Sequence, residues 1–100
     1  MTYYSVLEVT PTSEDWIPDY LSAAKTALAR HGGRFLARNA RHEQIEGQGR
    51  TAGLRVLIEW PSEEAAKAFI ADPEYLPHLK ARQAGSESFH WLIEGKDDLA

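Results

Sequence analysis

Arg82 and Tyr75 offer the clearest chemistry in this sequence. Arg82 comes seven residues after Tyr75 in a predicted helical stretch, and its planar guanidinium fork is suited to clamping a carboxylate or phosphate group. A structural role is the alternative, either as an internal salt bridge to Glu46 or Glu59 or as a bond to a backbone carbonyl. The sequence leaves both interpretations open, so Arg82 is a candidate ligand-binding residue.

Tyr75, Trp60 and Arg38 complete a candidate ligand site. The Tyr75 ring is apolar and its hydroxyl seeks a partner when buried, so it would line a pocket beside Trp60. The ordinary alternative is that such an aromatic residue closes the edge of a core. Arg38 would add a second guanidinium near the same partly apolar cavity. Together these residue types predict a pocket for a small acidic or aromatic molecule.

His90 is a weak candidate for catalysis and a further candidate for ligand binding. If Glu8 or Glu59 held one tautomer of the ring, the other nitrogen would be free to act as a base. A single histidine in a strand is more often structural or a contact between subunits. His90 is therefore kept as a hypothesis beside these two structural alternatives.

Metal and cofactor chemistry find no support in the sequence. His31, His42, His78 and His90 have no tight spacing such as His-x-x-x-His, so no metal site is predicted. The chain has no cysteine and therefore no thiolate nucleophile and no iron–sulfur site. The segment 47–49 connects two predicted strands and is not followed by Gly-Lys-Ser or Gly-Lys-Thr, so it is a turn and no phosphate loop. No cofactor is expected.

Composition bounds the class of protein. The 100 residues, 43% hydrophobic and 26% charged, suffice for one core and are too few for two. A net charge of -4 is the opposite of the clustered basic excess of nucleic-acid binders, so nucleic acid is not an expected partner. The first residues lack a basic segment followed by a long apolar run, so neither a signal peptide nor a membrane span is predicted. We expect a cytoplasmic protein.

The elements that would position these residues follow from hydrophobic spacing and turn residues. Strands are predicted over residues 3–9, 34–46, 52–60 and 86–94, and one helix over residues 14–31. A second helix begins after Ser62 and is interrupted at Asp72-Pro73, and a shorter helical stretch then ends at Gly85. This order predicts an α+β, ferredoxin-like β-α-β-β-α-β domain over residues 1–95, with a four-stranded antiparallel sheet, both helices on one face, and a polar tail over 96–100.

Alternation along the strands separates two faces of the predicted sheet. The face expected to meet the helices carries Leu7, Val9, Phe35, Ala37, Leu54, Val56, Ile58, Trp60, Phe89, Trp91 and Ile93. The opposite face is partly apolar and carries Tyr4, Val6, Glu8, Leu36, Arg38, Ala40, Arg55, Leu57, Glu59, His90, Leu92 and Glu94. A solvent-facing sheet does not normally gather so many aliphatic residues. We therefore predict a homodimer in which two such faces stack.

Four segments together resemble the family called domain of unknown function 1330 (DUF1330). They are residues 31–35 (His-Gly-Gly-Arg-Phe), 45–47 (Ile-Glu-Gly), 59–62 (Glu-Trp-Pro-Ser) and 72–75 (Asp-Pro-Glu-Tyr), the last followed by Arg82. The resemblance spans nearly the whole chain. It implies a ferredoxin-like fold and a dimeric habit within the wider dimeric α/β barrel group, and Arg at the position of Arg82. The family usually has Phe where this chain has Trp60, so the larger ring is expected to reduce or reshape the pocket.

The wider group also contains cofactor-free monooxygenases, haem-degrading enzymes and muconolactone isomerases. Asn39, Trp60 and His90 are residue types that cofactor-free oxygenases use, but strand alternation predicts His90 on the face opposite Trp60, so the three would not converge without a bulge. Three hypotheses follow. The leading one is a homodimer that binds a small acidic or aromatic molecule; the alternatives are a cofactor-independent isomerase or monooxygenase, and a structural or regulatory dimerisation module without ligand.

Overall fold

The computed structural model describes residues 1–100 and has the order β-α-β-β-α-α-β. The strands are β1 (Tyr3–Pro11), β2 (Arg34–Asn39), β3 (Leu54–Trp60) and β4 (Ser86–Glu94), and the helices are α1 (Ile17–Arg30), α2 (Glu63–Ile70) and α3 (Leu76–Ala84). The strands form one antiparallel sheet in the order β2-β3-β1-β4. The predicted α+β, ferredoxin-like fold is confirmed, with the second helical region divided into α2 and α3.

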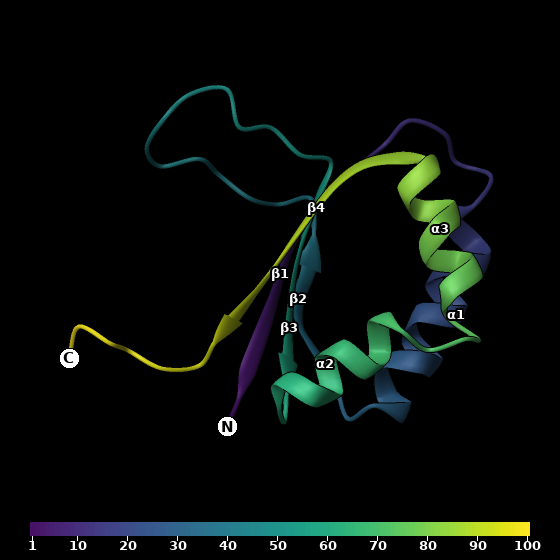
Figure 1. Cartoon of the computed structure of the whole chain (residues 1–100). Helices are drawn as coiled ribbons and strands as arrows, with labels where there is room; N and C mark the ends of the chain where they lie inside the picture. The colour runs from purple at the N-terminus through teal and green to yellow at the C-terminus, as the bar shows by residue number, and fades with distance from the viewer.

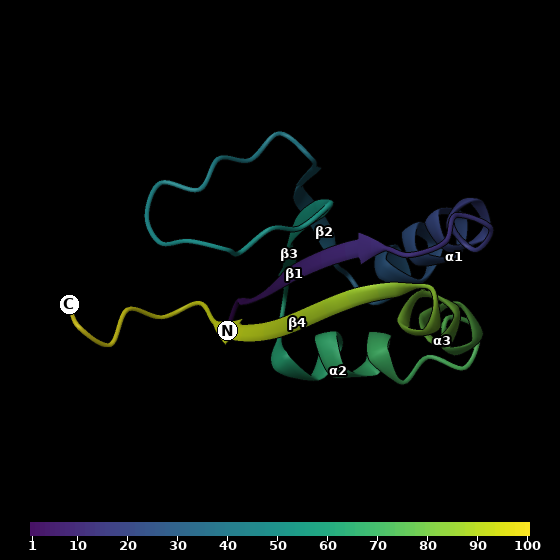
Figure 2. The same cartoon turned by 90° about the horizontal axis from the view of Figure 1, so that it is seen from above.

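All three helices cover the same face of the sheet (Figure 1). The β2–β3 connection and the C-terminal tail extend to the other side, and the view from above shows the same separation (Figure 2). The face toward the helices is called the inner face here, and the opposite one the outer face. No helix is both long enough and apolar enough to cross a membrane.

Local sequence explains where the helices begin and end. Pro18 lies in the first turn of α1, where its missing N–H has no intrahelical acceptor to lose. Gly32 follows α1 with a φ of +76°, a conformation that glycine adopts without steric cost. Ser62 caps α2, because its Oγ accepts a hydrogen bond from the Ala65 amide at 3.0 Å.

The predicted alternation of β4 is wrong. In the observed register Leu7 lies opposite His90 and Ser5 lies opposite Leu92, and residues directly opposite each other share a face. His90 and Leu92 therefore face the helices. Phe89, Trp91 and Ile93 lie on the outer face, all of them exposed in the single chain. Alternation failed because both sets of residues in this strand contain apolar side chains, so hydrophobicity alone did not distinguish them.

A second correction concerns β2, which contains a β-bulge between Phe35 and Ala37. Phe35 lies opposite Ile58 and Arg38 lies opposite Val56, so Phe35 and Arg38 share the inner face. Strict alternation had placed Arg38 on the outer face. One extra residue in a strand moves every later side chain to the opposite face of the sheet. No residue type in this segment indicates that such a bulge is present.

The core lies between the inner face and the helices. Its largest fully buried side chains are Trp60 and Tyr75, and the Phe69 ring packs between them, with ring centroids 5.1 Å from Trp60 and 4.2 Å from Tyr75. Gly33 permits this packing, because a Cβ there would lie 2.6 Å from a Trp60 ring carbon and 2.8 Å from Leu28. The Trp60 ring thus packs so close to the backbone of residue 33 that only glycine fits there.

Candidate functional site

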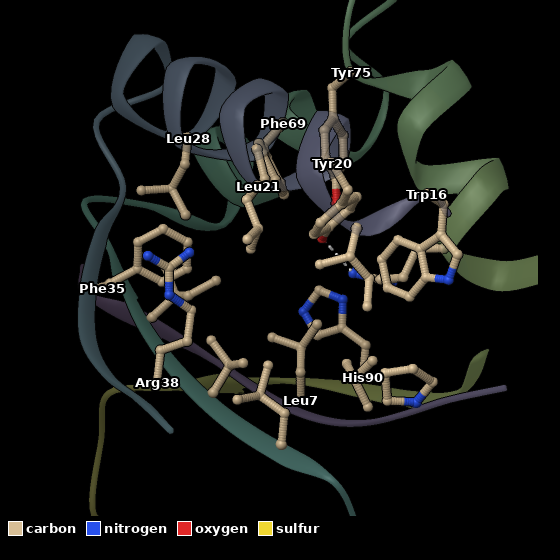
Figure 3. A pocket seen from close by; sticks show the side chains of 18 of the residues that line it. Leu7, Trp16, Tyr20, Leu21, Leu28, Phe35, Arg38, Phe69, Tyr75 and His90 are labelled. Atoms are coloured by element: carbon tan, nitrogen blue, oxygen red, sulfur yellow. Dashed lines mark hydrogen bonds between the residues drawn. The ribbon is translucent and has the colours of Figure 1, made fainter. Parts of the chain in front are cut away.

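A cavity of about 100 Å³ lies between the inner face of the sheet and helices α1, α2 and α3. Fifteen of its nineteen lining residues are hydrophobic, so its few polar side chains decide what it can bind. Arg38, Tyr75, Arg82 and His90 are among the lining residues, whereas Trp60 is not. Figure 3 shows Arg38 beside Phe35 at one side of the cavity and His90 at the other, near Trp16.

Arg82 is buried at this cavity without a counter-ion. It lies near the end of α3 with 4% of its surface exposed. Its Nη1 donates to the Tyr20 hydroxyl at 2.8 Å, and its Nε has no hydrogen-bond partner. The structural alternative of a salt bridge to Glu46 or Glu59 is not formed, since Glu59 pairs instead with Arg34 at 3.0 Å. Arg82 is therefore a positive charge with unused donor capacity.

The hydroxyls of Tyr20 and Tyr75 lie 2.8 Å apart beside Arg82. An arginine only donates, so the Tyr20 oxygen must accept from it. The two hydroxyls share one hydrogen bond, which uses one of their two hydrogens, and the remaining phenolic hydrogen has no protein acceptor whichever way the bond runs. Burial raises the pKa of Tyr75, and Tyr20 raises it further, so this phenol keeps its proton.

Ser5 joins two of the predicted site residues. Its Oγ lies 2.8 Å from Trp60 Nε1 and 2.8 Å from His90 Nε2, and both Ser5 and Trp60 are buried. Burial lowers the pKa of His90, and the positive charge of Arg82 lowers it further. Trp60 thus contributes to the site through Ser5 rather than by lining the cavity itself.

Arg38 and Asn39 differ in their relation to the cavity. The Arg38 guanidinium lies over the Phe35 ring, 3.9 Å from its centroid, a cation–π contact that leaves the cation open to solvent. Asn39 lies opposite Arg55 on the outer-face side of β3, and its Oδ1 accepts from the Arg41 amide at 2.9 Å. The structure therefore brings His90 and Trp60 together and leaves Asn39 apart from them.

Asp72 organises the helix that carries Arg82. Its Oδ2 accepts from Arg30 Nη2 at 2.8 Å and lies 2.7 Å from His31 Nε2, and its Oδ1 accepts from the Glu74 amide at 2.8 Å. Hydrogen bonds from Arg30 and His31 hold the pKa of Asp72 well below its usual range. This carboxylate ties the end of α1 to the start of α3 and so positions Tyr75.

Sequence reasoning missed Ser5, Tyr20 and the role of Asp72. Tyr20 meets Arg82 across 62 residues, and Ser5 meets His90 across 85 residues, so no local motif joins either pair. Tyr20 had been given no role in the site, and Asp72 appeared only in a helix interruption and in the motif of residues 72–75. No cluster of three or more His, Asp or Glu side chains is arranged to hold a metal ion.

The fold and its inner cavity define a small ferredoxin-like protein of the α+β class. Residues 2–96 match the family described as domain of unknown function (DUF1330), so the chain belongs to that family. No curated protein matches the sequence.

Solved structures with similar folds come from several bacteria. A protein of unknown function from Rhodopseudomonas palustris is 20% identical, with a TM-score of 0.77 over 96% of this chain and 83% of that chain. SnoaB, a cofactor-independent oxygenase from Streptomyces nogalater, is 23% identical, with a TM-score of 0.64 over 98% of this chain and 96% of that one. A ferredoxin-like dabb family protein from Mesorhizobium loti is 13% identical, with a TM-score of 0.67 over 96% and 98%. At these identities the likeness shows the fold.

Proposed function

We propose that this protein is a homodimer that binds a small anionic molecule in the cavity between sheet and helices. The observation that carries the proposal is Arg82, which is buried against the cavity with no carboxylate partner and with an unpaired Nε. A buried charge without a partner costs several kcal/mol. A ligand anion would supply the missing counter-ion, and the apolar lining would hold the rest of the molecule.

Anion-dependent stabilisation tests this proposal. We expect thermal unfolding of the wild-type protein to shift upward in at least one of acetate, benzoate and phosphate, because a ligand that binds only the folded state stabilises it. Arg82→Met should abolish the shift. Arg34→Met is the matched control, because Arg34 is exposed and paired with Glu59 on the sheet's edge. Equal shifts in wild type and Arg82→Met, or no shift with any anion, would contradict the proposal.

The dimer part of the proposal rests on the outer face of the sheet. Large hydrophobic side chains that a lone chain leaves exposed there, or at its β2 edge, are Val6, Leu36, Leu57, Phe89, Trp91 and Ile93. With the corrected alternation of β4 this face is more apolar than the sequence suggested. Contiguous exposed apolar surface of this kind is typical of protein interfaces. A second copy of the same face is the partner that the homodimer hypothesis specifies.

Charge placed within that face should disrupt the dimer. We expect light scattering to give about twice the 11.2 kDa chain mass for wild type and the single-chain mass for Trp91→Glu, since burying an unpaired carboxylate is unfavourable. Thr26→Glu adds the same charge to an exposed position of α1 on the helical side and should leave the dimer intact. A monomeric wild type at micromolar concentration would refute this part of the proposal.

A cofactor-independent oxygenase or isomerase is the second candidate. It is favoured by the Ser5 bridge between Trp60 and His90 and by the fold shared with SnoaB, itself a cofactor-independent oxygenase. Asn39 lies outside the cavity, which counts against an oxygenase site made of Asn39, Trp60 and His90. Oxygen uptake or isomerisation abolished by His90→Ala would support this candidate. The third hypothesis, a dimerisation module without ligand, requires a filled interior, and the cavity argues against it.

A further inference from the structure

Resting on the proposed anion site, we infer that its ligand is a small aromatic monocarboxylate and that His90 binds it as a hydrogen-bond donor. In this arrangement Ser5 and Trp60 fix the neutral His90 ring as the tautomer that carries its proton on Nδ1. In this role His90 donates a proton to a hydrogen bond, the opposite of acting as a base. That role depends on how the donors and acceptors around Ser5 and Arg82 are used.

The Ser5 hydroxyl decides the tautomer. Trp60 Nε1 is a donor only, so in its 2.8 Å contact the Ser5 oxygen accepts. Ser5 is fully buried, and the only other group within hydrogen-bonding distance of Oγ is His90 Nε2. If Nε2 carried a proton, the buried hydroxyl hydrogen would have no acceptor, at the cost of an unsatisfied polar group. Nε2 therefore accepts from Ser5, and the ring proton lies on Nδ1.

The charge state of His90 agrees with this assignment. Only a neutral imidazole has an accepting nitrogen, since both nitrogens donate in the protonated ring. Burial and the nearby Arg82 lower the pKa of His90, so the neutral ring is favoured near neutral pH. With Nε2 committed to Ser5, the free polar group of this cavity-lining ring is an N–H.

Three donors, all on residues that line the cavity, then lack a protein acceptor. They are one phenolic hydrogen of the Tyr20 and Tyr75 pair, His90 Nδ1–H, and the Arg82 Nε–H, which is enclosed in the unliganded chain and becomes reachable only if the surrounding side chains move. A ligand that satisfies them must present acceptor oxygens. A carboxylate offers two oxygens with about four lone-pair directions, and its single charge matches one buried guanidinium. A doubly charged phosphate would leave one negative charge without a buried counter-ion, because Arg38, the second guanidinium of the lining, lies exposed over Phe35.

The remainder of the cavity describes the body of the ligand. The lining is mainly hydrophobic and includes the rings of Trp16, Tyr20, Phe35, Phe69 and Tyr75. Aromatic rings favour offset-stacked or edge-to-face contact with another ring. The cavity volume of about 100 Å³ is somewhat smaller than the roughly 150 Å³ apolar cavity that holds benzene. Benzoate is larger than benzene, so a single-ring acid is the largest ligand to consider, and its binding requires the lining side chains to move apart.

Nuclear magnetic resonance tests the tautomer without any ligand. Long-range proton–nitrogen spectra of the imidazole rings, with His90 assigned by comparison with His90→Asn, should show an unprotonated Nε2 and a protonated Nδ1. Ser5→Ala should remove this preference. A protonated Nε2 in the wild-type protein would overturn the inference, whatever the protein binds.

Benzoate titration by calorimetry tests the ligand class. We expect His90→Phe to weaken benzoate binding about tenfold, the usual loss for one hydrogen bond to a charged group. His90→Asn should bind nearly as well as wild type, because the asparagine amide nitrogen is as many bonds from the backbone as Nδ1. Arg82→Met should weaken binding by more than His90→Phe does.

The outcomes separate this inference from the proposed anion site. Benzoate binding that needs Arg82 but is unchanged in His90→Phe would overturn the donor role of His90 and leave the anion site standing. Binding of phosphate in place of benzoate would overturn the ligand class alone. If neither anion nor acetate stabilises the protein, the proposed function fails, and the tautomer measurement still decides how Ser5 and His90 are bonded.

Discussion

Asp72 and Arg82 are two buried charges, one shortly before the start of α3 and the other in its last turn, and their hydrogen bonding differs. Asp72, 6% exposed, is surrounded by Arg30, His31 and two backbone amides. Arg82, 4% exposed, has one phenol as its partner and no carboxylate. A charge whose bonds are all made stabilises the structure, whereas a charge with unused donors is available to a ligand.

The same difference appears in where the two side chains lie. Asp72 closes the junction between α1 and α3 and is absent from the lining of the cavity between sheet and helices, whereas Arg82 lines it. Burial alone would have ranked the two residues equally. Counting bonds around each charge is what distinguishes a structural residue from a binding residue here.

Loss of Asp72 should produce the largest fall in stability. Asp72→Ala leaves Arg30 without its closest partner and frees the Glu74 and Tyr75 amides at the start of α3. We expect the melting temperature to fall on the order of 10 °C, measured by differential scanning calorimetry. Glu74→Ala is the control, because the exposed Glu74 lies 3.4 Å from Arg30 and such pairs contribute little. Equal falls in both variants would remove the structural role of Asp72.

Replacing Arg82 should act in the opposite direction on stability. Arg82→Met keeps the aliphatic length and removes a buried charge that has no ion partner, which is often neutral or stabilising in other proteins. We expect the melting temperature to rise by a few degrees while the response to benzoate is lost. A marked fall in the melting temperature would instead make Arg82 a structural residue like Asp72.

Acid should affect the Asp72 cluster in a predictable direction. The pKa of Asp72 is lower in the folded chain than its unfolded value of about 3.9, so the unfolded state binds the proton first as the pH falls. The stability from Asp72 is thus fully present above about pH 4 and is lost as the pH falls toward the folded pKa. The free energy of unfolding, measured with denaturant, should therefore fall more steeply between pH 5 and pH 2 in wild type than in Asp72→Asn. Parallel curves for the two proteins would contradict this.

Tyr20→Phe should have the smallest effect of the four. It removes the only acceptor of Arg82 Nη1 and leaves the ring in place, so we expect a loss of about 1 kcal/mol in the free energy of unfolding. Benzoate binding should persist, because the charge of Arg82 is unchanged. Loss of benzoate binding with normal stability would show that the phenol, and not the guanidinium, recognises the ligand.

The sequence indicated the order of elements well because the signals are local. Pro18 in a first turn, glycines after α1, Ser62 as a cap and Asp72-Pro73 as an interruption each act within a few residues. For the same reason Arg82 was placed correctly in a helix, while Tyr75 lies directly before that helix. Arg38 and His90 were also chosen from sequence, but the faces assigned to them were wrong.

Composition, turn residues and hydrophobic spacing by themselves determined an α+β ferredoxin-like chain and the residue types of its candidate site. Only the tertiary structure decided that β4 turns His90 toward the helices, that a bulge in β2 turns Arg38 with it, and that Ser5 and Tyr20 join residues 85 and 62 positions away. The physical reason is that strand facing is set by pairing register, and register is a property of two strands together. The absence of a counter-ion at Arg82 likewise depends on every element packed around that side chain, so no local sequence signal reveals it.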